Sequence, residues 1–144
     1  MLPKEHFAYA VIPAIAIYFY NPFYAILFLA STILTDIDHY IAYVLAFKKY
    51  NIISSINFYP EKLRPYLKRT NANVFLIFHN IETFIILLII SAFFPPAYFI
   101  FFGISLHYLL DLCCDYVINK RFPREESAVL YLFKKNKFSL KDVM

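Results

Sequence analysis

The sequence predicts an all-α integral membrane protein in which four transmembrane helices form one bundle. Three observations lead to this fold class. Of the 144 residues, 61% are hydrophobic and 17% are charged, whereas an average soluble domain is about 45–50% apolar and about 25% charged. The apolar residues gather in four long stretches, and every Lys and Arg lies outside them. A chain of this length cannot bury so much apolar surface in a soluble globule.

The four apolar stretches set the predicted elements. A transmembrane helix needs about 17–25 predominantly apolar residues, which the last three stretches provide. The first is shorter and ends at Asn21-Pro22. We therefore expect a transmembrane domain over residues 1–117, a loop over 48–72 and a tail over 118–144. The predicted spans cover residues 5–20, 22–47, 73–94 and 97–117.

The charge of the connections predicts the orientation of the bundle. The 48–72 loop and the 118–144 tail are basic, whereas the connections after Tyr20 and Phe94 carry no charge. Lys and Arg close to transmembrane ends mark the cytoplasmic side. Both termini are therefore expected in the cytoplasm, and the chain is expected to be a multi-pass protein of the cell membrane.

The tail and the central loop are both expected at the membrane surface. In the tail, Pro123 followed by Glu125 and Glu126 predicts a helix start. Apolar residues and then Lys134, Lys135 and Lys137 follow, which predicts an interfacial helix that contacts anionic lipid. Lipid accounts for the basic tail without nucleic acid. The apolar residues of 52–59 predict either a second interfacial segment or a lid.

The polar residues inside the spans are the main functional signal. From Phe7 to Val117, the spans hold five carboxylates and three histidines, but no Lys or Arg. A charge at membrane depth costs at least about 2.5–3.5 kcal/mol, so these carboxylates are protonated, lie close to water or bind cations. Gly103, His107, Asp111 and Asp115 follow one another at intervals of four and share one helix face. With His6 at the mouth of the first span, the histidines favour a bound cation.

Position along the spans brings these residues to a similar depth, in the cytoplasmic half of the bilayer. Helix bundles build di-metal sites from His and carboxylate side chains on facing helices. Mixed imidazole and carboxylate ligands favour one or two ions of Zn²⁺, with Mn²⁺ or Fe²⁺ next. The predicted metal ligands are His6, Asp36, Asp38, His39, His79, His107 and Asp111.

Glu82 and Asp38 are the candidate catalytic residues. Glu82 lies three residues after His79 on the same predicted helix, where it is expected to act as a general base or to orient a histidine N–H. Either Asp36 or Asp38 is expected to bridge two ions. The adjacent Cys113 and Cys114 are expected to pack as apolar side chains.

These motifs resemble a known family. An early His is followed by LTDIDH at 34–39, FLIFHNIE at 75–82 and GISLHYLLD at 103–111. The set is similar to the YdjM-like membrane-bound metal-dependent hydrolases, whose pattern is an early His, PDIDH, HRGxTHS and G-x-x-x-H-x-x-x-D. The resemblance covers residues 1–115 and carries the family's site onto the seven predicted ligands. Thr35 replaces the family's Pro, and the other His of the third motif falls on Val74 if His79 is the second of the pair, or on Phe84 if His79 is the first.

The resemblance implies a metal-dependent hydrolase. A site about 10 Å inside the inner leaflet reaches bonds next to the lipid headgroups, so we expect a lipid-linked phosphoester or related ester as the substrate. Two alternatives stay open. The same His and Asp residues suit a small cation or proton transporter or channel subunit, and the chain is also compatible with a catalytically inactive membrane scaffold.

Overall fold

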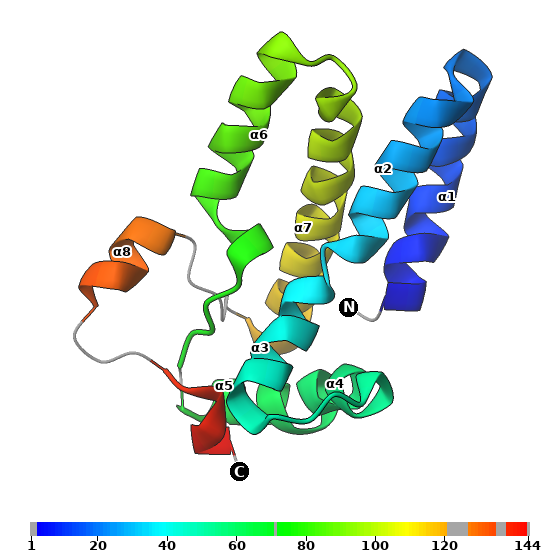
Figure 1. Ribbon diagram of the computed structural model, residues 1–144. Helices are drawn as coiled ribbons and strands as arrows, with labels where there is room; N and C mark the ends of the chain where they lie inside the picture. The colour runs from blue at the N-terminus through cyan, green and yellow to red at the C-terminus, as the bar shows by residue number, and fades with distance from the viewer. Residues whose placement is uncertain (1–2, 71, 121–126, 135–137, 144) are drawn as a thin grey trace. The chain divides into compact units, whose positions relative to one another are not determined.

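The computed structural model describes residues 3–70, 72–120, 127–134 and 138–143, and every regular element in these ranges is a helix (Figure 1). This confirms the all-α class. The chain divides into two compact units. Unit 1 comprises residues 1–35 and 82–114, and unit 2 comprises residues 36–81 and 115–144.

Unit 1 is built from long apolar helices: α1 (Pro3–Tyr20), α2 (Pro22–Leu34), α6 (Ile81–Phe93) and α7 (Ala97–Asn119), which continues into unit 2. The helices α1 and α2 lie side by side (Figure 1). Asn21 separates them, because its side chain accepts a hydrogen bond from Phe23 N at 2.9 Å and caps α2. Ala10 and Ala14 pack on Phe28 in a small core, and their short side chains let the two helices approach closely.

The outer surface of unit 1 is strongly apolar. Ile12 is 77% exposed, Phe19 84% and Phe93 86%. Large contiguous apolar surfaces on a chain mark contact with a membrane or a partner. By length and composition, two helical segments can cross a membrane, Pro22–Phe47 and Ala97–Val117, while α6 is a shorter apolar helix.

The predicted span at 22–47 consists of two helices, α2 and α3 (Ile37–Phe47), with a turn at Thr35 and Asp36 between them. The hydroxyl groups before the turn explain it in part. Thr35 Oγ1 donates to Ser31 O at 2.6 Å, and Thr32 Oγ1 donates to Phe28 O at 2.8 Å. Such bonds to the preceding helical turn bend helices. The expectation of one continuous helix is therefore corrected at this point.

The predicted span at 73–94 is helical only from Ile81 to Phe93. Before it lie a short 3₁₀-helix at Ile77–His79 and extended backbone at Leu76 and Asn80. The amide of Phe78 donates to Asp38 Oδ2 at 3.1 Å. Because that amide bonds to a side chain, it is taken out of a regular helical ladder. The apolar composition of 73–80 alone could not indicate this.

Unit 2 contains most of the predicted 48–72 loop, and this segment is largely helical. It forms α4 (Ile52–Phe58), the π-helix η1 (Tyr59–Leu63) and α5 (Arg64–Thr70). Asn51 caps α4 by accepting a hydrogen bond from Ser54 N at 3.0 Å. The segment folds because it carries the apolar core of the unit. The core residues are Tyr43, Phe58, Leu63, Leu67, Val74 and Leu76.

Two elements follow in the tail, α8 (Ala128–Phe133) and the 3₁₀-helix η3 (Leu140–Val143). The helix start predicted at Pro123–Glu126 lies outside the described residues, as do Lys135 and Lys137. Ser127 caps α8 by accepting a hydrogen bond from Leu130 N at 3.2 Å. Leu130, Leu132 and Phe133 are exposed on this helix.

Two lysines of unit 2 adopt left-handed backbone conformations, Lys48 and Lys120, each with φ 56°. Lys48 follows the last turn of α3, and its amide donates to Val44 O at 2.8 Å. Lys120 follows α7, and its amide donates to Tyr116 O at 2.9 Å. Both residues therefore occupy positions at helix ends that glycine usually fills.

Candidate metal centre

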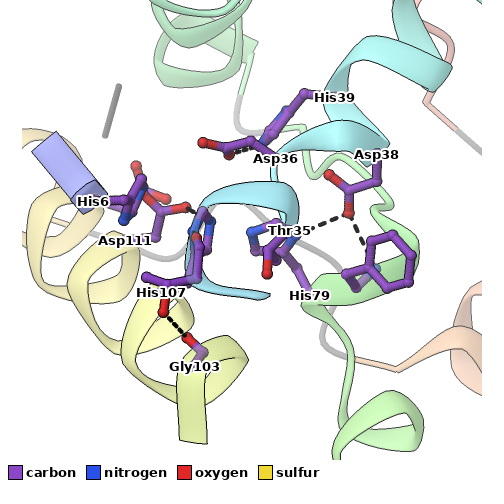
Figure 2. A network of polar contacts seen from close by, with 12 residues as sticks. His6, Thr35, Asp36, Asp38, His39, His79, Gly103, His107 and Asp111 are labelled. Atoms are coloured by element: carbon purple, nitrogen blue, oxygen red, sulfur yellow. Dashed lines mark hydrogen bonds and ion pairs between the residues drawn. The ribbon is translucent and has the colours of Figure 1, made fainter. Parts of the chain in front are cut away.

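In unit 1 the structure brings together His6 from α1 with His107 and Asp111 from α7 (Figure 2). His6 Nε2 lies 3.2 Å from Asp111 Oδ1, and His107 Nε2 lies 3.3 Å from Asp111 Oδ2. The two imidazole rings are stacked, with their centroids 3.8 Å apart. None of the three residues is more than 1% exposed. We call this set the buried triad.

The position of the proton on His107 follows from its other nitrogen. His107 Nδ1 lies 2.7 Å from the carbonyl oxygen of Thr32. A carbonyl oxygen only accepts, so Nδ1 must carry the proton that forms this bond. In the neutral ring, Nε2 then presents a lone pair toward the Asp111 carboxylate. Two electron-rich atoms at 3.3 Å repel each other unless a proton or a metal ion lies between them.

Either a proton or a metal ion can occupy each of the two contacts of the buried triad. Asp111 supplies one negative charge, and protonating both histidines would stack two cations at 3.8 Å without exposure to water. A divalent ion would avoid this stacking of charge, because both histidines stay neutral and Asp111 offsets one of its two positive charges. Two ligand atoms about 2.0–2.1 Å from a tetrahedral ion are themselves about 3.3 Å apart. The two nitrogen–oxygen distances in the triad match this spacing.

Gly103 allows α7 to approach α2 at the triad. A Cβ atom at this position would lie 2.5 Å from Phe28 O and would also clash with Ser31 Oγ. Thr32 Oγ1 lies 3.2 Å from Gly103 O across the same contact. Thr32 therefore supplies the carbonyl that holds His107, a role that sequence reasoning missed. The only signal was that Gly103 lies one helical turn before His107.

In unit 2 a second set forms from Asp36, His39 and His79, whose ligand atoms lie within 4.8 Å of one another. Asp36 lies in the turn before α3, His39 in the first turn of α3, and His79 at the end of the 3₁₀-helix. His39 Nε2 is 3.7 Å from Asp36 Oδ1, and the rings of His39 and His79 are 5.5 Å apart. We call this set the open triad, because the Asp36 and His39 side chains are 14% and 16% exposed.

Asp38 contacts the Nδ1 side of the His79 ring and is not one of the three residues of the open triad (Figure 2). Asp38 Oδ2 is 3.0 Å from His79 Nδ1 and also accepts the Phe78 amide. A carboxylate that binds one imidazole nitrogen fixes the ring orientation and leaves Nε2 for a metal ion. Asp38 is 2% exposed, and its Oδ1 has no hydrogen-bond partner among the described residues. The structure thus favours a positioning role for Asp38 over a bridging one.

Each triad offers two imidazoles and one carboxylate. Three protein ligands of this kind leave coordination positions open, which is typical of catalytic Zn²⁺ sites and of mononuclear Fe²⁺ sites. Structural Zn²⁺ sites instead use four protein ligands. The convergence of all seven predicted ligands on one site stays a prediction.

The remaining candidate positions, Glu82, Val74 and Phe84, lie outside the two triads. Glu82 is in the first turn of α6 and half-buried, and neither triad includes it among the described residues. Its role as a general base stays a prediction. The two positions open to a second His of the third motif are both apolar contacts: Val74 lies in the core of unit 2, and Phe84 packs against Phe101 and Tyr108.

Known proteins supply no assignment for this site, because no family model, curated protein or solved structure matches the chain.

Proposed function

We propose that this protein is a membrane-embedded, metal-dependent hydrolase that acts on a lipid-linked phosphoester or a related ester at the cytoplasmic leaflet. The single observation that carries the proposal is the buried triad, in which two histidine nitrogens face one carboxylate at 3.2 and 3.3 Å without exposure to water. These three side chains could together hold a divalent ion. The resemblance to the YdjM-like hydrolases points to the same reaction class.

The proposal includes four membrane spans with both termini in the cytoplasm. Exposed apolar side chains on α1 and α6, among them Ile12, Ile89 and Phe93, support lipid contact on the helices other than the two long apolar segments. With 13 residues, α6 is about 20 Å long, shorter than a hydrocarbon core of about 30 Å. We therefore expect the bilayer to thin around it.

The candidate residues have three roles in the proposed reaction: metal binding, positioning of a ligand and acceptance of a proton. His6, His107 and Asp111 would hold one ion, and Asp36, His39 and His79 would hold another. When bound, a divalent ion supplies Lewis acidity that polarises a phosphoryl or carbonyl oxygen and activates water. Asp38 holds His79 in the correct orientation. Glu82 is proposed to accept a proton from the attacking water.

Metal analysis of the purified chain tests the proposal first. We expect at least one equivalent of Zn²⁺, Mn²⁺ or Fe²⁺ per chain by mass spectrometry, and we expect His107→Ala to lose it. Cys114→Ala is the matched control, because Cys114 is a potential ligand on the same helix but belongs to neither triad. No bound transition metal, together with unchanged stability in His107→Ala, would contradict the metal site.

A measurement of activity distinguishes the proposed hydrolase from the transporter and scaffold alternatives. The metal-loaded protein in nanodiscs should hydrolyse p-nitrophenyl phosphate or a related ester, and Glu82→Gln should remove this activity while metal content is retained. Cation or proton flux into proteoliposomes without any hydrolysis would support the transporter alternative instead. Bound metal without hydrolysis or flux would support a scaffold.

A further inference from the structure

One basic residue, Arg64, is connected to the open triad through a tyrosine ring. Arg64 is the first residue of α5, and its side chain is 19% exposed. Its guanidinium lies over the ring of Tyr59, with Cζ 5.4 Å from the ring centroid. The same Tyr59 ring contacts His39 edge-on, with centroids 4.7 Å apart. Tyr59 therefore lies between Arg64 and a ligand of the open triad.

The π-helix at Tyr59–Leu63 creates this contact. The amide of Arg64 donates to the carbonyl oxygen of Tyr59, five residues earlier. In an α-helix, residues five apart lie about 140° apart around the axis and do not face each other. The wider π turn brings them onto one face. Pro60, which lacks an N–H, removes one bond of the α-helical pattern inside this turn. π-Helical turns of this kind occur frequently at functional sites.

Asp115 holds Arg64 from a second direction. Asp115 Oδ1 lies 3.9 Å from Arg64 Nη2, and the carboxylate is 1% exposed. A guanidinium carries five N–H donors in a planar fork. With one face on Tyr59 and Nη2 directed at Asp115, the side chain is fixed before any ligand arrives. A fixed guanidinium suits bidentate binding of a phosphate group.

We propose that Arg64 binds the phosphate group of the substrate beside the open triad, which narrows the substrate class from esters in general to phosphoesters. This inference rests on the proposed function for the identity of the site, but the binding of phosphate can be measured without turnover. Tyr59 and Asp115 act as positioning residues.

The chain supplies a matched control within the same helix. Arg69 also lies over a tyrosine ring, that of Tyr66, with Cζ 5.8 Å from the centroid. Arg69 is exposed, and its tyrosine packs in the contact with Phe138 rather than with a histidine. Replacing Arg69 therefore removes an equal charge and an equal stacking contact away from the open triad.

The first experiment measures binding of inorganic phosphate to the Zn²⁺-loaded full chain in phosphatidylcholine nanodiscs by calorimetry. We expect Arg64→Gln to weaken binding at least about tenfold, the effect of losing a charge-assisted pair, and Arg69→Gln to leave it within about twofold. Arg64→Lys should give an intermediate value, because lysine keeps the charge but not the fork. Unchanged phosphate affinity in Arg64→Gln overturns the inference.

The second experiment compares two substrates with one leaving group. For p-nitrophenyl phosphate, Arg64→Gln should raise KM and lower kcat/KM at least about tenfold, while hydrolysis of p-nitrophenyl acetate stays near the wild-type rate. An equal loss for both substrates would leave the hydrolase intact and overturn the role of Arg64. Phosphate binding that depends on Arg64, with no hydrolysis by the wild type, would support Arg64 and contradict the proposed function.

A third experiment tests whether Arg64 binds the phosphate of a lipid or that of a soluble phosphoester. Phosphatidic acid is added to the nanodiscs, and the affinity for inorganic phosphate is measured again. Competition that disappears in Arg64→Gln supports Arg64 as a binder of lipid phosphate. Binding of inorganic phosphate without competition supports Arg64 as a binder of a soluble phosphoester. Competition that is equal in the wild type and in Arg64→Gln contradicts Arg64 as the binding residue.

Discussion

The two triads use the same three ligand types on different kinds of backbone. The buried triad comes from two long helices, and no member is more than 1% exposed. The open triad comes from a turn, the start of a helix and a 3₁₀-helix, and two of its side chains are 14% and 16% exposed. Irregular backbone positions side chains for access, whereas packed helices hold them rigidly. Under the proposed function, substrate would reach the open triad, and the buried triad would hold its ion.

The largest expected effect is the loss of the Asp111 carboxylate. Asp111→Asn removes the only negative charge of the buried triad, and we expect the free energy of unfolding to fall by about 3–5 kcal/mol together with loss of metal. Asp36→Asn removes the matching carboxylate of the open triad and should cost only about 1 kcal/mol. Unfolding in mixed micelles and metal content measure both variants. Equal stability losses in the two variants would contradict the difference expected between the buried triad and the open triad.

Gly103→Ala should disturb the buried triad alone. The added Cβ meets Phe28 O at 2.5 Å, so α7 must shift and the bond between His107 and the Thr32 carbonyl must lengthen. We expect a loss of about 1–3 kcal/mol, as for other overpacked contacts. Leu109→Ala, at an exposed position of the same helix, is the control and should change stability by less than about 0.5 kcal/mol. A stable Gly103→Ala variant with full metal content would show that the close approach is not required.

Asp38→Asn should act on the open triad. The amide keeps an acceptor for the Phe78 N–H but loses the charge that holds His79 Nδ1–H. Loss of such a partner typically weakens metal affinity about 10–100-fold. A competition titration with a chelating dye should show one weakened site and leave the buried triad unchanged. Full affinity in this variant would mean that Asp38 serves core packing only.

The smallest effect is expected in the tail. Ser127→Ala removes the side chain that caps α8, which should destabilise this helix by about 1 kcal/mol. Hydrogen exchange of the α8 amides measures the change. Metal content of both triads should stay at the wild-type value, and a loss of metal would tie the tail to the sites.

Local patterns predicted a large part of this molecule. Composition predicted the all-α class, and the interval of four between His107 and Asp111 predicted their contact at 3.3 Å. The break at Thr35 and Asp36 could not be predicted, because it depends on hydroxyl bonds to the preceding turn. The early end of the third helix depends on Asp38, which lies 40 residues from the amide it accepts.

The contact between Arg64 and Tyr59 could not be predicted from the sequence, for a geometric reason. In an α-helical register Arg64 would lie far around the axis from Tyr59, so no sequence pattern at the usual intervals connects the two residues. Only the π turn at Tyr59–Leu63 brings them together. Asp115 shares a helix face with Gly103, His107 and Asp111, and it is buried and forms an ion pair with Arg64.

At Lys48 and Lys120, which adopt left-handed backbone conformations, an unstrained backbone competes with a positive charge at the helix end. An L residue in this conformation costs roughly 1–2 kcal/mol, and glycine would relieve the strain. Glycine, however, brings no positive charge to the end of a helix, where a cation interacts favourably with the helix dipole. With only one glycine in 144 residues, the chain keeps a charged side chain at both helix ends at the expense of folding stability. Evolution toward a more stable variant would begin at these two positions and would remove charge from the face expected to meet anionic lipid.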